Sequence, residues 1–287
     1  MLHSPEVAQK HLWPSAVIDL SERDKYILVA ALTDGTLQLF ENTGNSLDLV
    51  LEFPMSIGKA GFGKQIEGDK KTPVGVYRIT SFLNDNQLDA FYGRAAYPVD
   101  YPNVWDRLQN RTGSGIWLHA MPEGVTSRPP LDSDGCLVIN NEQIDVLKPY
   151  LDVGRTRIVM TDSNQRVDPS VISQKRELLT NQLMAWKSSW ESLSHKQYLD
   201  FYSTEFNNFD YDKAAWDTYK KRVNGKKKFI NIGISDLAIF EYPGVDNLVM
   251  VEFYQSYKSN DYKSNGWKKQ LWKEEQNGWK IIYEAGG

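Results

Sequence analysis

The sequence predicts two domains, a mainly-β domain followed by an α+β domain. The chain has 287 residues, which is long for one domain and suits two. Short apolar runs separated by turn residues fill positions 25–160, a pattern typical of strands. After a polar segment at 161–169, an apolar stripe with helical spacing comes first, and strand-like runs follow it.

Composition narrows the range of partners and ligands. The hydrophobic share of 41% and charged share of 24% are those of a globular protein. A net charge of −4 indicates no nucleic-acid partner, and the absence of a long apolar run predicts no membrane span. The four histidines are scattered without metal-ligand spacing, so we expect no metal site and no cofactor.

Residues 1–24 form an N-terminal extension to which we assign no chemistry, with a short helix expected around 7–12. The first ten residues lack the apolar core of a signal peptide. Either the protein is cytoplasmic or its signal has been removed. A single cysteine excludes an internal disulfide and leaves the compartment open.

The first domain reads as strands joined by turns. A hairpin is expected from 26–31 and 36–41 around Asp34-Gly35, followed by strands at 47–53, 55–57 and 74–82. The glycine-rich loop at 58–68 carries lysines but fits no phosphate-binding motif. The aromatic stretch 84–110 is either a packed loop or a lid whose arginines meet peptide carboxylates. A helix at 141–150 and a strand at 157–160 complete the domain.

The second domain begins with a helix and continues as a sheet. Leu179, Leu183, Trp186 and Trp190 recur at helical spacing, which indicates a core face. Strands are expected at 229–234, 248–257, 267–275 and 279–284, with a hairpin turn at Asn277-Gly278. No acid/base pair stands out in this part of the chain, so we expect it to be non-catalytic.

One stretch, 117–140, carries the chemistry. His119 follows an apolar run expected as a strand at 115–118, and Cys136 precedes a second one at 137–139. Two adjacent strands would bring imidazole and thiol together, as a base-activated nucleophile requires. The amides of Gly135 and Cys136 could face a developing oxyanion. The alternative is a buried, inert cysteine beside an unrelated histidine.

These residues resemble a known family. His119-Ala120 followed by Ser133-Asp134-Gly135-Cys136 is similar to the HG…SxGC motif of L,D-transpeptidase (YkuD-type) catalytic domains. The segment 68–77 (GDKKTPVGVY) resembles a second family block, and 97–103 with 112–117 resembles its YafK-like branch. The pattern of 170–287 resembles an NTF2-like cone. The combination resembles cell-shape L,D-carboxypeptidases.

The resemblance implies a fold and domain bounds. We expect a mainly-β L,D-transpeptidase catalytic fold at 25–162 and an α+β NTF2-like cone, an accessory domain, at 170–287. It also implies a substrate, the peptide stems of peptidoglycan, and hence a periplasmic or cell-envelope location. A cell-wall protein could dock on the second domain, and the oligomeric state stays open.

The implied reaction is attack by Cys136 on the bond between diaminopimelate and D-alanine of a tetrapeptide stem, with His119 as base. A thioester forms, which an amine acceptor resolves as a transpeptidase product or water as an L,D-carboxypeptidase product. The residues implied in catalysis are Cys136, His119, Ala120, Ser133 and Gly135, and those implied in substrate binding are Lys71, Tyr101, Trp117, Asp134 and Arg111.

Two departures from the family pattern bear on the site. Ala120 replaces a glycine whose carbonyl orients the imidazole in the family. Val138 stands where many members have an arginine, which removes a cation near the substrate. Both also fit a non-enzymatic wall-binding module. An activated Cys136 would react with alkylating agents well below the pH at which a free thiol does. A papain-like protease fits poorly, because there the cysteine precedes the histidine.

Overall fold

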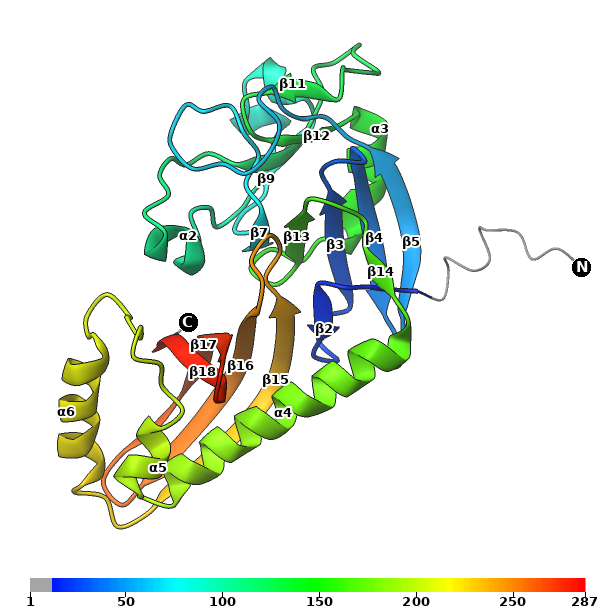
Figure 1. Ribbon diagram of the computed structural model, residues 1–287. Coiled ribbons are helices and arrows are strands. Elements are labelled where there is room, and N and C mark those ends of the chain that lie inside the picture. The colour runs from blue at the N-terminus through cyan, green and yellow to red at the C-terminus, as the bar shows by residue number, and fades with distance from the viewer. Residues whose placement is uncertain (1–11, 287) are drawn as a thin grey trace, which may run out of the picture. The chain divides into compact units, whose positions relative to one another are not determined.

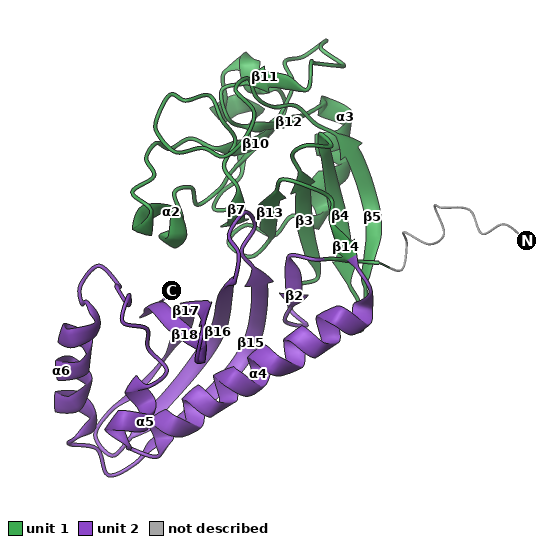
Figure 2. Cartoon of the chain, in the orientation of Figure 1, with its two compact units in different colours: residues 1–14, 24–166 green, residues 15–23, 167–287 purple. Residues whose placement is uncertain are grey.

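The structure, a computed structural model, describes residues 12–286 (Figure 1). Residues 1–11 lie outside the described residues, and with them all but the last residue of the helix expected at 7–12. The chain divides into two compact units, residues 1–14 with 24–166 and residues 15–23 with 167–287 (Figure 2).

The first unit is built from sheets. Its described residues form a five-stranded sheet in the order β5-β4-β3-β13-β7, a four-stranded sheet in the order β12-β10-β9-β8 and a small β11-β6 pair. The strands are β1 (Trp13–Pro14), β3 (Tyr26–Ala31), β4 (Thr36–Asn42), β5 (Leu47–Pro54), β6 (Ile57–Gly58), β7 (Gly75–Arg78), β8 (Leu83–Asn84), β9 (Ala95–Pro98), β10 (Trp117–Ala120), β11 (Leu131–Ser133), β12 (Leu137–Ile139) and β13 (Arg157–Thr161). The helices are η1 (Asp85–Gln87), η2 (Ala90–Tyr92), α2 (Val104–Leu108), α3 (Asn141–Leu147) and η3 (Lys148–Tyr150).

The expected hairpin is confirmed, since β3 and β4 pair antiparallel from Tyr26↔Glu41 to Ala31↔Thr36. Strand β13 then lies between β3, which it pairs in parallel, and β7. One buried cluster includes Leu28 and Ile158 of this sheet together with Leu118 and Leu137 of the four-stranded sheet. The strands that carry the candidate site are therefore anchored in the core of the first unit.

The prediction for 84–110 as a stretch without periodic elements was wrong in detail. It contains the end of β8, the helices η1, η2 and α2, and strand β9, which pairs with β10. Ala95 and Tyr97 of β9 are buried in the core. A strand of four residues is too short to display a period, and the capping boxes at Asn84 and Asn103 start helices of one turn or little more.

The second unit combines helices with one curved sheet. Among the described residues its strands take the order β18-β17-β16-β15-β2. The elements are β2 (Val17–Asp19), β14 (Arg166–Val167, at the junction of the units), α4 (Pro169–Glu191), α5 (His195–Leu199), α6 (Lys213–Asn224), β15 (Ile230–Glu241), β16 (Leu248–Ser259), β17 (Lys263–Glu275) and β18 (Gly278–Gly286). Asp168 caps α4, and the four expected apolar residues of its stripe are buried as predicted.

The N-terminal extension supplies part of this second sheet. Strand β2 pairs antiparallel with β15, through Val17↔Phe240 and Asp19↔Ile239. Ile18 is fully buried in the same hydrophobic cluster as Trp186 and Ile239. Three residues carry too little pattern to reveal a strand. The extension thus packs with a domain whose other residues begin about 150 positions later in the chain.

We predict that Ile18→Ala destabilises the second unit by about 2–5 kcal/mol, because it leaves a cavity in a packed core. Val171→Ala is the control, since Val171 is exposed in the same unit. Chemical denaturation followed by tryptophan fluorescence measures both. A midpoint for Ile18→Ala equal to that of the control would show that β2 does not belong to this core.

Candidate active site

The pairing of two short strands brings His119 and Cys136 together. Strand β10 pairs in parallel with β12, through Leu118↔Leu137, His119↔Val138 and Ala120↔Ile139. The predicted adjacency of the two strands is therefore confirmed. His119 lies inside β10, however, and not beyond its end, because the strand runs from Trp117 to Ala120 and not from 115 to 118.

Strand alternation decides which side chains share a face. Leu118, Ala120, Leu137 and Ile139 all belong to the hydrophobic core cluster. Successive residues of a strand point to opposite faces. His119 therefore points away from the core, and Cys136, one residue before β12, leaves on the same face. Cys136 precedes Val138, the register partner of His119, by two residues.

His119 is held in a buried, aromatic setting. Its Nδ1 contacts the Ala120 carbonyl oxygen at 2.7 Å, the contact that the family resemblance led us to expect at this position. The Tyr92 ring lies edge-on at 5.1 Å from the imidazole, and Tyr92 also packs on Trp117 at 4.8 Å. Burial lowers the pKa of His119 to about 4, so the imidazole is neutral at pH 7. A neutral ring held at Nδ1 offers Nε2 as the base.

Cys136 is also uncharged in the resting site. Burial raises the pKa of its thiol to about 11, although the Trp117 amide opposes this shift. Sγ lies 3.4 Å from the Gly115 carbonyl oxygen, which accepts from the thiol. Burial therefore favours the neutral thiol in the resting site. The desolvation of the thiolate outweighs the donors around it.

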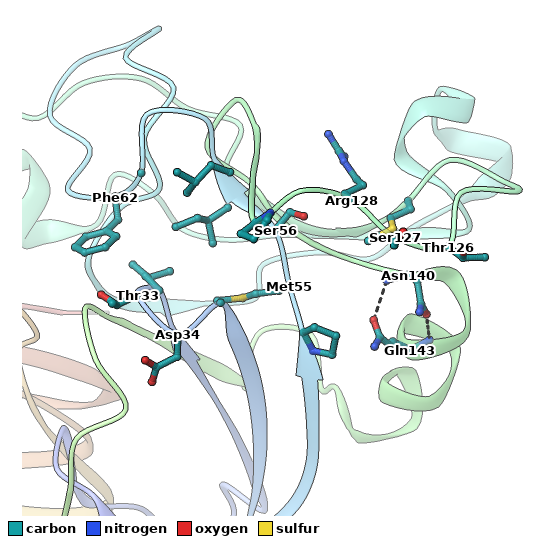
Figure 3. A pocket seen from close by; sticks show the side chains of 18 residues that line it. Thr33, Asp34, Met55, Ser56, Phe62, Thr126, Ser127, Arg128, Asn140 and Gln143 are labelled. Atoms are coloured by element: carbon teal, nitrogen blue, oxygen red, sulfur yellow. Dashed lines mark hydrogen bonds between the residues drawn. The ribbon is translucent and has the colours of Figure 1, made fainter.

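A cavity of about 610 Å³ lies beside this site but does not contain it (Figure 3). Its lining includes Met55, Phe62 and Asn140, and neither His119 nor Cys136 belongs to it.

The turn before Cys136 is fixed by Ser133. The Ser133 hydroxyl donates to the Cys136 carbonyl at 2.7 Å and accepts from the Gly135 amide at 3.1 Å. The Gly135 amide is thereby engaged, which leaves the Cys136 amide as the oxyanion donor of the expected pair. Gly135 has φ +128°, and an added Cβ would meet the Lys71 carbonyl at 2.9 Å. Only glycine fits this position without a shift of backbone.

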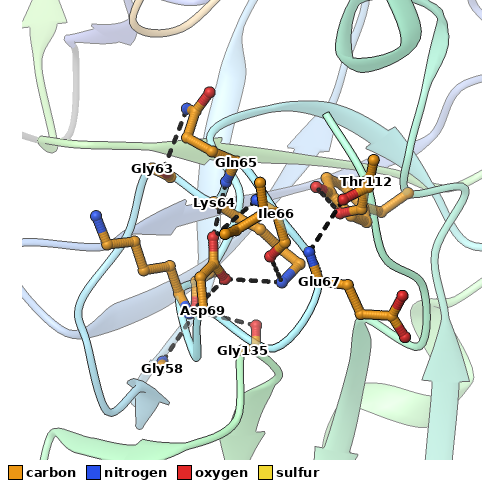
Figure 4. A network of polar contacts seen from close by, with 12 residues as sticks. Gly58, Gly63, Lys64, Gln65, Ile66, Glu67, Asp69, Thr112 and Gly135 are labelled. Carbon is orange, nitrogen blue, oxygen red and sulfur yellow. Dashed lines mark hydrogen bonds and ion pairs between the residues drawn. The ribbon is translucent and has the colours of Figure 1, made fainter. Parts of the chain in front are cut away.

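Thr72 ties this turn to the glycine-rich loop. Its buried hydroxyl accepts from the Gly58 amide at 2.9 Å and donates to the Gly135 carbonyl at 3.0 Å. Both contacts appear in Figure 4. The residue before Cys136 is thus held by a side chain 63 positions away in sequence. Thr72 was not singled out as a site residue, because nothing in its spacing reveals the contact.

Lys64 of the glycine-rich loop forms an ion pair within that loop. Lys64 is buried and its ammonium lies 2.8 Å from Asp69 (Figure 4). Partial burial alone would raise the pKa of Asp69, but Lys64 and the amides of Gln65, Ile66 and Lys71 donate to the carboxylate and hold that pKa at about 2. This network shapes the loop that carries Thr72.

The expected substrate-binding residues differ in how they are engaged. Tyr101 is buried and donates its hydroxyl to the Thr112 carbonyl at 3.0 Å. Arg111 pairs with the fully buried Asp106 at 2.9 Å. Both therefore support the loops. Trp117 lies at the site on β10. The backbone carbonyl of Lys71 lies close to Gly135, the residue before Cys136. The carboxylate of Asp134 is exposed and lies 3.4 Å from the Lys59 ammonium.

Three residues at the site were missed by sequence reasoning. Phe91 and Tyr92 of η2 flank the imidazole, with Phe91 at 6.3 Å between ring centroids. Arg128, in the loop between β10 and β11, lies over Phe91 at 5.7 Å. Loop residues carry no periodic signal, so neither contact could be predicted.

Val138 is fully buried, and its backbone exchanges two hydrogen bonds with Ser56, at 2.8 and 2.9 Å. The longer, charged side chain of an arginine would not fit in this buried position without a shift of its neighbours. Within residues 12–286 no group of three or more His, Cys, Asp or Glu side chains is arranged to hold a metal ion. No helix among the described residues is both long and apolar enough to cross a membrane.

We predict that Thr72→Val costs about 1–3 kcal/mol of stability, because it leaves a buried amide and a buried carbonyl unpaired. Thr72→Ser keeps the hydroxyl and is the control. Denaturation midpoints measure the loss of stability. The rate of Cys136 alkylation reports whether the turn before Cys136 keeps its shape. If the valine variant matched the serine variant in both, the hydroxyl would not hold the turn.

Comparison with known proteins gives the site a family. Residues 24–160 match the L,D-transpeptidase catalytic domain (YkuD), and residues 178–285 match the Cds6 C-terminal NTF2-like domain. Bd1075 of Bdellovibrio bacteriovorus is 28% identical, with a TM-score of 0.83 over 96% of this chain and 98% of that one. No curated protein sequence matched.

A second solved structure is similar over almost the same length. The helical cell shape determining protein Pgp2 of Campylobacter jejuni is 27% identical, with a TM-score of 0.79 over 95% of each chain. The chain is thus a YkuD-type L,D-transpeptidase catalytic domain followed by an NTF2-like domain.

Proposed function

We propose that this protein is a cysteine enzyme that cleaves the diaminopimelate–D-alanine bond of peptidoglycan tetrapeptide stems. One observation carries the proposal. A neutral imidazole, oriented through Nδ1 by the Ala120 carbonyl, shares a sheet face with the thiol of Cys136 on the adjacent strand. The match of residues 24–160 to the L,D-transpeptidase catalytic domain supports the choice of substrate.

The pKa values favour general-base attack over a resident ion pair. A thiol with pKa near 11 and an imidazole with pKa near 4 stay neutral together at pH 7. The proton therefore leaves Sγ for Nε2 of His119 as sulfur attacks the carbonyl carbon. The Trp117 amide favours the charge on sulfur, and the Cys136 amide is the candidate donor to the oxyanion.

Collapse of the tetrahedral intermediate completes the first half-reaction. The carbon–nitrogen bond breaks, His119 returns the proton to the leaving amine, and a thioester remains on Cys136. An amine of another stem then yields a crosslink, and water yields a tripeptide. Both outcomes share this first half-reaction. We propose transfer to an amine acceptor as the second one. L,D-carboxypeptidase activity is the second candidate, and the similarity to a cell shape determining protein favours it.

The proposed location is the periplasm or cell envelope, where this substrate lies. The support comes from the catalytic family and from the cell-shape relative. We propose that the NTF2-like domain is an accessory domain that contacts the wall or a wall protein. A purely wall-binding protein has no specific observation in its favour.

We predict that Cys136→Ala abolishes turnover and leaves the fold intact, since no other thiol exists in the chain. Incubation with disaccharide-tetrapeptide, with and without an acceptor stem, followed by mass analysis of products, measures both reactions. Turnover near the wild-type rate, with an unchanged circular dichroism spectrum, would remove Cys136 from the mechanism and leave the wall-binding alternative.

We predict that His119→Ala lowers kcat/KM by about 10²–10⁴, the usual contribution of a positioned acid/base group. In the wild type, kcat/KM should persist as pH falls from 8 to about 5 and decline as pH approaches 4, where the imidazole protonates. His195→Ala, in the other unit, is the control. A decline already centred near pH 6.5 would contradict a buried, neutral base.

A further inference from the structure

Arg128 places a guanidinium over Phe91, the ring that flanks the imidazole of His119. Its side chain is only 10% exposed, although it belongs to a loop. Burial is the largest cause of the lowered pKa of His119 and of the raised pKa of Cys136. The positive charge of Arg128 lowers both pKa values, so it adds to the shift of His119 and opposes that of Cys136. The chain thus has a cation at the site although Val138 replaces the family arginine.

One edge of this guanidinium is committed and another is not. Nε lies 2.8 Å from the Asp132 carboxylate, and Nη2 donates to the Asp132 carbonyl. Nη1 is buried and has no hydrogen-bond partner among the described residues. Arg128 is one of the residues that line the cavity beside the site, together with Met55 and Asn140 (Figure 3). Asp132 therefore fixes the plane of the guanidinium and leaves one nitrogen for another acceptor.

A buried donor without a partner costs about 1–3 kcal/mol, and more when it is charged. A ligand that accepts from it recovers this free energy. Guanidinium nitrogens bind carboxylates in particular, because both groups are planar and oppositely charged. Lys64 and Arg111 of this region pair with Asp69 and Asp106, and Arg111 also keeps one buried nitrogen, Nε, without a partner among the described residues. Arg128 differs from both in that it packs over Phe91, whose ring flanks the imidazole.

We propose that Arg128 binds the α-carboxylate of the leaving D-amino acid. This assignment rests on the proposed function. His119 protonates the leaving nitrogen, and the α-carboxylate is separated from that nitrogen by one carbon. A guanidinium that packs over Phe91, beside the imidazole that protonates this nitrogen, is placed for the carboxylate. Arg128 would then select stems that end in a free carboxylate and hold the scissile bond against Cys136.

The first test needs no peptidoglycan substrate. Iodoacetate and iodoacetamide alkylate Cys136 by the same step, in which a carbon–sulfur bond forms and iodide leaves. They differ in that iodoacetate carries a carboxylate next to the attacked carbon. We expect Arg128→Gln to lower the iodoacetate-to-iodoacetamide rate ratio about tenfold, the lower limit for a charge-assisted hydrogen bond. Arg128→Lys should retain part of it.

Arg155→Gln is the matched control, because Arg155 also pairs with carboxylates, Asp24 and Asp152, in the same unit. Its rate ratio should equal that of the wild type. A purely structural role of Arg128 would slow both reagents equally and leave the ratio unchanged. An unchanged ratio in Arg128→Gln would overturn the proposal, whatever the enzyme's natural substrate.

The second test uses a tetrapeptide stem and its C-terminal amide, which differ only in the terminal carboxylate. We expect the wild type to prefer the acid and Arg128→Gln to lose about 10- to 100-fold in kcat/KM on the acid and little on the amide. Equal losses on both would contradict carboxylate recognition. If the wild type cleaved neither, the proposed function would fail, and the alkylation ratio would still decide the role of Arg128.

Discussion

The parallel pairing of β10 with β12 is the constraint on which the candidate site depends. It sets Leu118 and Leu137 into the core, and alternation then sends His119 and Cys136 to the opposite face. A slip of one strand by one residue would turn its apolar side chains away from the core. The core of the first unit thus fixes the register, and the register fixes the chemistry.

Loops complete what the strands begin. Ser133 and Thr72 hold the backbone on either side of the nucleophile, and the aromatic residues of η2 exclude water from the imidazole. This burial has an electrostatic consequence, because desolvation disfavours both charged forms. Thiol and imidazole rest neutral, so in the proposed mechanism charge develops only during attack. The proposed role of Arg128 is to place a fixed cation near that charge.

Much of the architecture follows from sequence because it rests on repeated patterns. The hairpin at 26–41, helix α4 and the last three strands were predicted from periodicity and turns, and the pair His119/Cys136 from its flanking strands. Elements of three or four residues, β2 and β9, were not, because so few residues display no period. Thr72 and Arg128 make contacts between loops that are distant in sequence, and the spacing of residues in the sequence does not reveal such contacts. The thiol pKa depends on burial, which the spacing does not reveal either.

The central claim is that Cys136 carries the acyl group during turnover. It is tested most directly by quenching a reaction with disaccharide-tetrapeptide in acid and mapping the adduct by peptide mass analysis. The account predicts a thioester on the peptide that contains Cys136, with the mass of the stem lacking D-alanine, and slower formation in His119→Ala. Product formation with no adduct on Cys136 under any quench time, or an adduct on another residue, would contradict it.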